Sequence, residues 1–208
     1  MKTVTKVAER LEEYVNSFLP KLEQRFESRE KLLMTAREAI RYSGEAISLA
    51  HRGKAKEAEE KFELAKAKAK EIAEVVKNFP DLLYGDVGTA FQELSEAAFV
   101  LSVYLGKDLP SPEELGVPEF HYLLGAADAV GEMRRRVLEL LRKGRKEEAE
   151  ETYSIMEEIY EVLWELEYPK SLVPNLRQKI DYMRRVLEDT HHDLFIAEMS
   201  LGGKTHFE

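Results

Sequence analysis

Apolar residues recur along almost the whole chain at spacings of three and four, which is the period of an amphipathic α-helix. The first such series lies near the N-terminus and contains Val7, Leu11, Val15, Phe18, Leu22 and Phe26. No segment alternates polar and apolar residues over the length that a half-buried β-strand requires. The sequence therefore predicts an all-α protein.

Glycine and proline residues divide this pattern into six predicted helices. They cover residues 7–51, 54–78, 88–105, 118–141, 147–166 and 176–201. Gly53 follows the first helix, and Pro20 is expected to kink that helix or to split it in two. Six or seven helices favour one antiparallel bundle, so we expect a single domain over residues 1–208.

The composition narrows the classes of protein that this bundle can belong to. With 208 residues, of which 44% are hydrophobic and 34% charged, the chain is long enough for a sizeable core. It has no cysteine, which excludes disulfides, thiolate nucleophiles and Cys-ligated metal sites. No apolar run is long enough to cross a bilayer, and the N-terminus lacks the apolar core of a signal peptide. These features predict a cytoplasmic protein without a membrane contact.

The net charge of −9 argues against a generic nucleic-acid binder, because such proteins are usually basic. Nearly all of the negative charge lies after residue 79. A polyanion could therefore bind only through local basic contacts, or with metal ions that mask the acids.

Two sets of acids interrupt helical segments that are otherwise apolar. Glu93 and Glu96 lie three residues apart in the segment FQELSEAAFV, and Asp128 and Glu132 lie four apart in YLLGAADAVGEMRRR. On a helix, each spacing places both carboxylates on the same face. Four convergent carboxylates would repel one another unless a cation lies among them, which predicts a metal site.

Each of these acids also has a simpler interpretation. Glu93 and Glu96 could be exposed charges, although their apolar neighbours leave little room for a polar face. Asp128 follows three small residues that let helices approach closely, so it could form a hydrogen-bonded contact between helices. Glu132 could pair with Arg135 or with the arginine that follows it.

A third candidate site lies in the last helix, where Glu188 and His191 have the Glu-x-x-His spacing of di-iron bundles. Such sites use this motif on two helices, and the sequence has no second copy. We therefore favour an exposed position for His191 and His192. A di-iron carboxylate protein remains a third interpretation, which bound iron and a visible absorption band would support.

Three blocks of the sequence resemble the translin/Trax family, and specifically its Trax branch. Residues 29–52 are similar to the N-terminal helix of the family, which likewise opens on Arg-Glu and ends on His-Arg. FQELSEA, from residue 91, resembles the Trax stretch FQE-x-x-E-A, and YLLGAADAVGEMRR, from residue 122, resembles YLLG-x-AD-x-x-GE. The resemblance covers most of the chain from residue 29 onward.

This resemblance implies an all-α protomer that assembles into a closed, usually octameric, shell. It also implies an Mg²⁺-dependent endoribonuclease acting on single-stranded RNA, with Mn²⁺ as an alternative ion. The catalytic, metal-binding acids of the family correspond to Glu93, Glu96 and Asp128, and Glu132 is an adjacent fourth candidate ligand. Single-stranded DNA as a substrate and a translin-like partner chain are left open.

Three arginines are candidates for RNA contact, since a guanidinium group binds phosphate in a bidentate manner. Arg37 and Arg52 occupy positions where the family also has arginine, and Arg135 matches an arginine of the third block. The alternative from a different class is a non-catalytic, translin-like scaffold that binds single-stranded nucleic acid. The complete set of acids favours the enzyme, because a scaffold would not need it.

Overall fold

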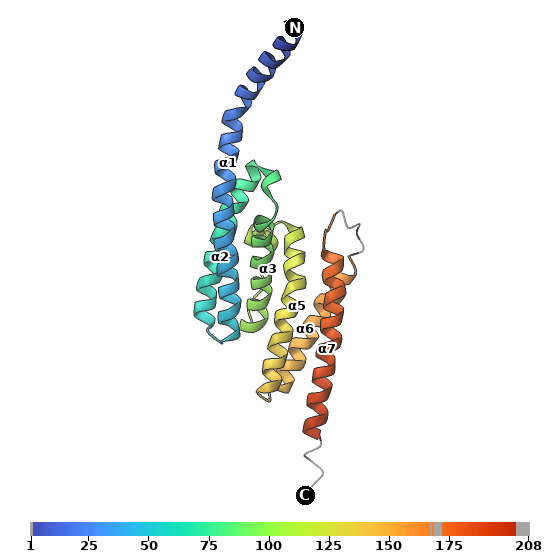
Figure 1. Cartoon of the computed structure of the whole chain (residues 1–208). Coiled ribbons are helices and arrows are strands. Elements are labelled where there is room, and N and C mark those ends of the chain that lie inside the picture. The colour runs from blue at the N-terminus through green and yellow to red at the C-terminus, as the bar shows by residue number, and fades with distance from the viewer. Residues whose placement is uncertain (1, 167, 169–171, 203–208) are drawn as a thin grey trace.

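The computed structural model describes residues 2–166, 168 and 172–202, and every regular element within them is helical (Figure 1). The helices are α1 (Lys2–His51), α2 (Ala55–Asn78), α3 (Asp86–Leu105), α4 (Pro112–Leu115), α5 (Glu119–Arg142), α6 (Lys146–Trp164) and α7 (Leu176–Gly202), with a short 3₁₀ helix, η1 (Pro80–Leu82). The predicted all-α class is confirmed. The single-turn helix α4 and η1 lie in segments that the sequence predicted as loop and turn.

Helix α1 is one continuous helix of 50 residues with Pro20 in its interior. The alternative that Pro20 splits this helix into two is therefore wrong. Proline removes one backbone hydrogen bond and crowds the preceding turn, which bends a long helix without ending it. The ribbon of α1 is bent in its N-terminal half, where it extends beyond the other helices (Figure 1).

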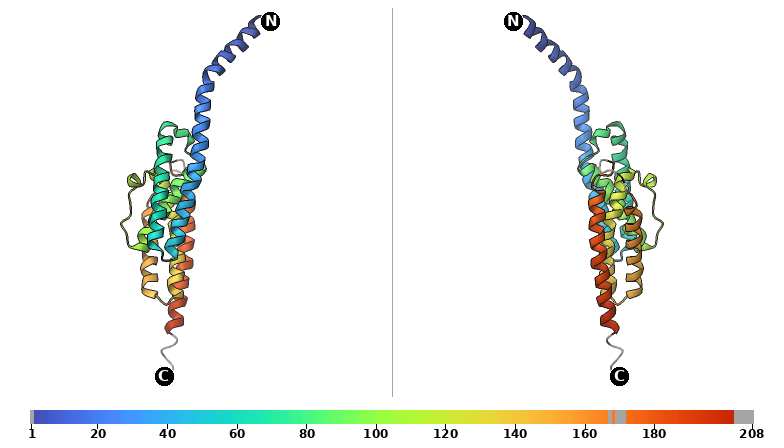
Figure 2. Two further views of the ribbon diagram at one scale, coloured as in Figure 1. Left: turned by 90° about the vertical axis from the view of Figure 1, so that its left-hand side faces the viewer. Right: turned by 90° about the vertical axis from the view of Figure 1, so that its right-hand side faces the viewer.

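The long helices run antiparallel to their neighbours in sequence, with one exception within the described chain at α3 and α5. Two contacts show that these helices run parallel. Gly88 lies against His121 near the starts of both helices, and Tyr104 contacts Glu132 farther along both. The connection between them returns along the outside of the bundle and includes α4 (Figure 2). Ser111 begins α4 with a capping box, in which its hydroxyl accepts from the amide of Glu114.

Helix α3 lies at the centre of the molecule and is buried on two sides. Its Ala90, Phe91 and Leu94 belong to a hydrophobic cluster shared with α1 and α2. Its Ala97 and Val100 belong to a second cluster shared with α5, α6 and α7. A helix packed on both sides has little surface for charged residues, so the acids of α3 must lie in the seam between helices.

The structure also bears on the predicted absence of a membrane contact. Among the residues that it describes, no helix is both long and apolar enough to span a bilayer.

Candidate metal site and basic cavity

The two acid-bearing helices meet at Gly125 of α5, which lies directly against the backbone of α3. A Cβ atom at this position would fall 2.6 Å from the carbonyl oxygen of Gln92 and 2.7 Å from the amide nitrogen of Glu96. Carbon atoms do not approach backbone atoms this closely, so only glycine fits here. The prediction that the small residues before Asp128 allow a close approach of helices is confirmed.

This contact brings the acids of α3 and α5 into one half-buried region. Burial is the main cause that raises the pKa of Glu96 to about 8, and repulsion from Glu93 and Asp128 adds to it. Burial and the charge of Asp128 also raise the pKa of Glu93 above its ordinary value. The interpretation of Glu93 and Glu96 as fully exposed charges is therefore wrong, since both side chains are partly buried.

Asp128 connects three helices through its two carboxylate oxygens. Gln92 of α3 donates a hydrogen bond from Nε2 to Oδ2 over 2.5 Å, and Lys179 of α7 forms an ion pair with Oδ1. The helix–helix contact considered for Asp128 is therefore present. Lys179 was not identified from the sequence, because nothing in the spacing within α7 indicates which helix it faces.

Glu132 is held by a residue from the end of α1. His51 forms a hydrogen bond through Nε2 to Glu132 Oε2, and this bond is the main cause that lowers the pKa of Glu132. Arg135 lies at 3.8 Å from the same oxygen, as one alternative predicted. Arg136 does not pair with Glu132. Its guanidinium group stacks 4.5 Å from the ring centroid of Tyr104.

A divalent cation fits this donor set in its chemistry. Mg²⁺ prefers oxygen ligands and is commonly held by one or two carboxylates. Burial raises the pKa values of Glu93 and Glu96, and the neighbouring carboxylates add to this shift, which a bound cation would oppose. The side chains are not yet arranged as ligands, however: within the described residues, no three Asp, Glu or His side chains surround a common point. To bind the ion, Asp128 would have to release Lys179, and Glu132 would have to release His51.

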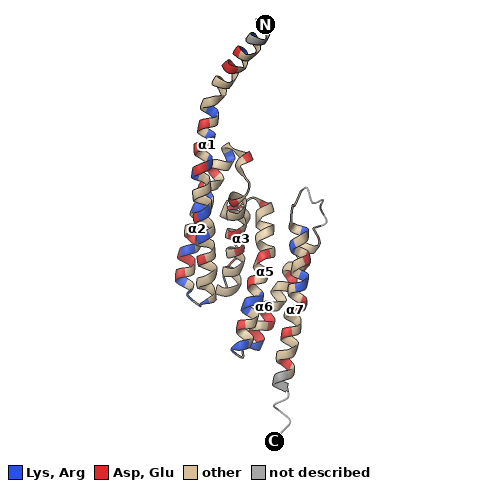
Figure 3. Ribbon diagram, viewed as in Figure 1, with Lys and Arg blue, Asp and Glu red and all other residues tan. Residues whose placement is uncertain are grey.

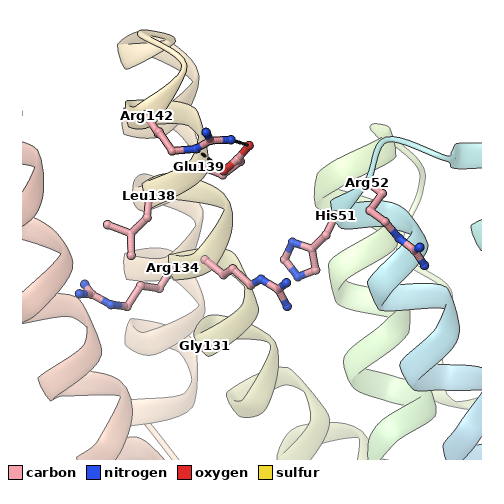
Figure 4. A pocket seen from close by; sticks show the side chains of 8 residues that line it. His51, Arg52, Gly131, Arg134, Leu138, Glu139 and Arg142 are labelled. Atoms are coloured by element: carbon pink, nitrogen blue, oxygen red, sulfur yellow. Dashed lines mark hydrogen bonds and ion pairs between the residues drawn. The ribbon is translucent and has the colours of Figure 1, made fainter.

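A cavity of about 550 Å³ lies next to the acids, between the end of α1 and the C-terminal half of α5 (Figure 4). Its lining residues are His51, Arg52, Gly131, Arg134, Arg135, Leu138, Glu139 and Arg142. Figure 3 shows Lys and Arg gathered at this end of α5. His51 borders both the cavity and the acids, so the two sites are contiguous.

The arginines of this cavity differ in how firmly they are already paired. Arg134 bonds to Thr190 and Asp193 of α7, and Arg142 pairs with Glu139 of its own helix. Arg52, in contrast, follows the last residue of α1 and hydrogen-bonds only to Ser48 of that helix in the part of the chain that the structure describes.

Of the three arginines predicted to contact RNA, the structure brings together Arg52 and Arg135. Arg37 lies away from this cavity, where its Nε is 3.4 Å from Asp86 at the start of α3. In the last helix, His191 and His192 are exposed, as predicted. No di-iron-like group of ligands exists among the described residues.

The protein is thus an all-α bundle with a central carboxylate set and an adjacent basic cavity. No family model matches the chain. The chain is 35% identical over 182 residues to the uncharacterised protein MJ0175 of Methanocaldococcus jannaschii. The matched region covers 83% of this chain and 78% of that protein.

Solved structures show which family this class corresponds to. AfC3PO superposes with a TM-score of 0.79 and 33% identity over 90% of this chain and 98% of the other. A structure of AfC3PO in complex with duplex RNA superposes with a TM-score of 0.81 and 32% identity, over 90% of this chain and 97% of the other. The chain belongs to the translin/Trax family, to which these C3PO structures belong. NeC3PO shares the fold, with 24% identity and a TM-score of 0.80 over 88% of this chain and 96% of the other.

Proposed function

We propose that this protein is a metal-dependent endoribonuclease that cleaves single-stranded RNA by hydrolysis of a phosphodiester bond. The observation that carries the proposal is the seam at Gly125, which concentrates Glu93, Glu96 and Asp128 next to a cavity rich in arginine. Repelling carboxylates that are partly buried are costly to the folded chain, and a bound cation would relieve that cost.

Glu93, Glu96 and Asp128 would hold Mg²⁺ or Mn²⁺, with Glu132 as a fourth ligand. When bound, the ion supplies Lewis-acid stabilisation of negative charge on the phosphate and lowers the pKa of water. One of these carboxylates would also accept the proton of the attacking water.

The basic cavity would bind the RNA strand on the side of Glu132. Arg52 supports this role best, because its guanidinium group has no carboxylate partner among the described residues. Arg135 lies beside it with only a long contact to Glu132. Binding through these cations would weaken steeply with salt, because it releases counterions from the phosphates. Arg37 would contact RNA only after leaving Asp86.

The decisive experiment measures cleavage of labelled single-stranded RNA in Mg²⁺ and in EDTA. We expect Glu93→Gln and Asp128→Asn each to lower the rate at least about 100-fold, since the loss of transition-state stabilisation at such sites has this size. Glu151→Gln, an exposed carboxamide substitution on α6, is the matched control and should cleave as the wild type does. Folded variants that retain the wild-type rate, or cleavage that continues in EDTA, would overturn the mechanism.

One observation favours a second candidate function, a non-catalytic scaffold for single-stranded nucleic acid. Asp128 and Glu132 already have cationic or hydrogen-bonding partners in Lys179 and His51, so these two acids do not depend on a metal ion. A scaffold predicts RNA binding that EDTA leaves unchanged and no cleavage in any divalent ion. Parallel assays with single-stranded DNA test whether the sugar is recognised.

We further propose that the protein works as a homo-oligomer, with an octamer as the expected state, in the cytoplasm. A translin-like partner chain would replace some of these copies. The membership of the family supports this proposal, and mass measurement of the purified protein tests it.

A further inference from the structure

Lys179 lies near the start of α7, where this helix packs beside α5 (Figure 1). Its ammonium group forms an ion pair with Oδ1 of Asp128, and the two side chains are 24% and 26% exposed. The backbone at this position is held in place, because the amide of Lys179 donates to the carbonyl oxygen of Asn175 over 3.1 Å and the next residue, Ile180, is buried. The ammonium group can therefore change partners by rotation of its flexible stem, without movement of the helix.

The attachment of α7 to α5 does not depend on this ion pair. Farther along the two helices, Arg134 of α5 donates hydrogen bonds to Thr190 and Asp193 of α7. Met183 of α7 is fully buried in the hydrophobic cluster that α7 shares with α5. A partly exposed ion pair adds little to a contact of this kind. The position of Lys179 among the acids therefore needs another explanation.

Lys179 supplies a positive charge to acids that come from two other helices. Besides its contact with Asp128, its charge opposes the rise in the pKa of Glu93 and Glu96 that burial causes. One ammonium group neutralises these three carboxylates only in part. A divalent cation among the same acids would repel the ammonium group and compete with it for Oδ1 of Asp128.

An ammonium group that leaves Asp128 would have a second anion within reach once RNA is bound. Two oxygen atoms bound to one Mg²⁺ lie at most about 4.2 Å apart, because each lies about 2.1 Å from the ion. A phosphate oxygen that shares the ion with Asp128 would thus lie close to the position that the ammonium group occupies in the free protein. Lysine is a common phosphate ligand, since it presents a compact charge with three donors.

We propose that Lys179 leaves Asp128 when a divalent cation binds the acids, and that its ammonium group then donates to the phosphate at which the RNA is cleaved. Lys179 thus takes the place of the ion in the free protein and stabilises negative charge on the reacting phosphate in the complex. This role rests on the proposed endoribonuclease function and adds a residue of α7 to it.

The first experiment measures Mg²⁺ binding to the full chain by isothermal titration calorimetry, without RNA. We expect Lys179→Met to bind Mg²⁺ at least about ten-fold more tightly than the wild type, because no ammonium group then competes for Asp128. Lys146→Met is the matched control. Lys146 is 25% exposed and pairs with Glu150 and Glu198 rather than with the proposed ligands, so its loss should leave the affinity for Mg²⁺ unchanged.

The second experiment measures RNA cleavage at saturating Mg²⁺. Lys179→Met should lower kcat about 100-fold with little change in KM, because the lost contact is made to the reacting phosphate. Lys179→Arg should cleave within about ten-fold of the wild-type rate, since a guanidinium group also donates to phosphate. Lys146→Met should keep the wild-type rate. Circular dichroism confirms that each variant is helical.

Tighter Mg²⁺ binding together with slower cleavage separates this role from a purely structural one. If Lys179 only neutralises Asp128, Lys179→Met should bind Mg²⁺ more tightly and cleave as fast as the wild type. If Lys179 only orients Asp128, the variant should bind Mg²⁺ more weakly. Either result would overturn the proposal while the wild type still binds Mg²⁺ and cleaves RNA. A wild type that neither binds Mg²⁺ nor cleaves RNA would overturn the proposed function as well.

Discussion

Replacing Glu96 by glutamine removes a charge that the folded chain holds at a cost, while keeping the size of the side chain. Glu96 is partly buried in the seam between α3 and α5, and its pKa is about 8 against an ordinary value of 4.5. A folded-state pKa above the unfolded value means that stability is complete below about pH 4.5 and declines as the pH rises towards 8. The variant lacks this titration, so it should not show this part of the decline.

The size of the effect follows from the two pKa values. Each pKa unit between the folded and unfolded states corresponds to about 1.4 kcal/mol. The free energy of unfolding of Glu96→Gln should therefore exceed that of the wild type by up to about 3 kcal/mol at pH 7, and by up to about 5 kcal/mol above pH 8. For a chain of this length, 1 kcal/mol changes Tm by roughly 2–4 °C, so the variant should melt roughly 6–12 °C higher at pH 7.

The assay is thermal melting followed by circular dichroism from pH 4.5 to 9, first with EDTA and then with Mg²⁺. In EDTA, the difference in Tm between variant and wild type should grow with pH and level off above about pH 8. In Mg²⁺, the wild type should gain stability, because an ion that binds only the folded chain stabilises it by mass action. The variant lacks one proposed ligand and should gain less.

Two results would contradict the roles given to Glu96. A difference in Tm that does not change with pH would show that the ordinary pKa of Glu96 survives in the folded chain. A variant that gains as much stability from Mg²⁺ as the wild type would remove Glu96 from the ligands. Glu151→Gln, exposed on α6, is the control for both arms and should follow the wild type at every pH.

Three further substitutions test the surroundings of the acids. Gly125→Ala should lower the free energy of unfolding by about 1–3 kcal/mol, because the new Cβ atom would overlap the backbone of α3. Gly44→Ala is the control: no atom lies within 4 Å of its Cβ position, so this substitution should raise the free energy of unfolding by up to about 1 kcal/mol. Chemical denaturation measures both changes. Lys179→Met removes a charge that lowers the pKa of Glu96, so the pH profile of RNA cleavage should move to higher pH, and an unmoved profile would contradict this role. His51→Gln removes the hydrogen bond that is the main cause of the low pKa of Glu132, so ¹³C NMR titration of Glu132 should show a higher pKa in the variant.

Much of the helical architecture could be read from the sequence, because the signals involved are local. The period of the apolar residues predicted six long helices, and Gly53 predicted the end of the first one, which lies at His51. The structure confirmed these elements to within a few residues. Of the two alternatives for Pro20, a kink or a split, the structure excludes the split, since a proline can bend a helix whose remaining hydrogen bonds are intact.

The candidate site could be predicted only in part. The sequence identified the acids and placed each pair on one face of its helix, because a helix fixes the direction of side chains three and four residues apart. It did not identify His51 or Lys179 as their partners. Those contacts join residues separated in the sequence by 81 and 51 positions, and no periodicity within a helix encodes such pairs.

The pattern of residues along the chain was enough to predict a helical protein, the positions of its helices, and two acidic pairs that interrupt apolar segments. The packing of the helices established that α3 and α5 run parallel and meet at Gly125, so that Glu96 is partly buried next to other carboxylates. The packing also leaves the apolar side chains of α1 from Val7 to Phe26 uncovered by the other described elements. This difference arises because backbone hydrogen bonds and the side-chain period act over one or two turns, whereas the direction and register of packed helices depend on the shape of every surface in contact.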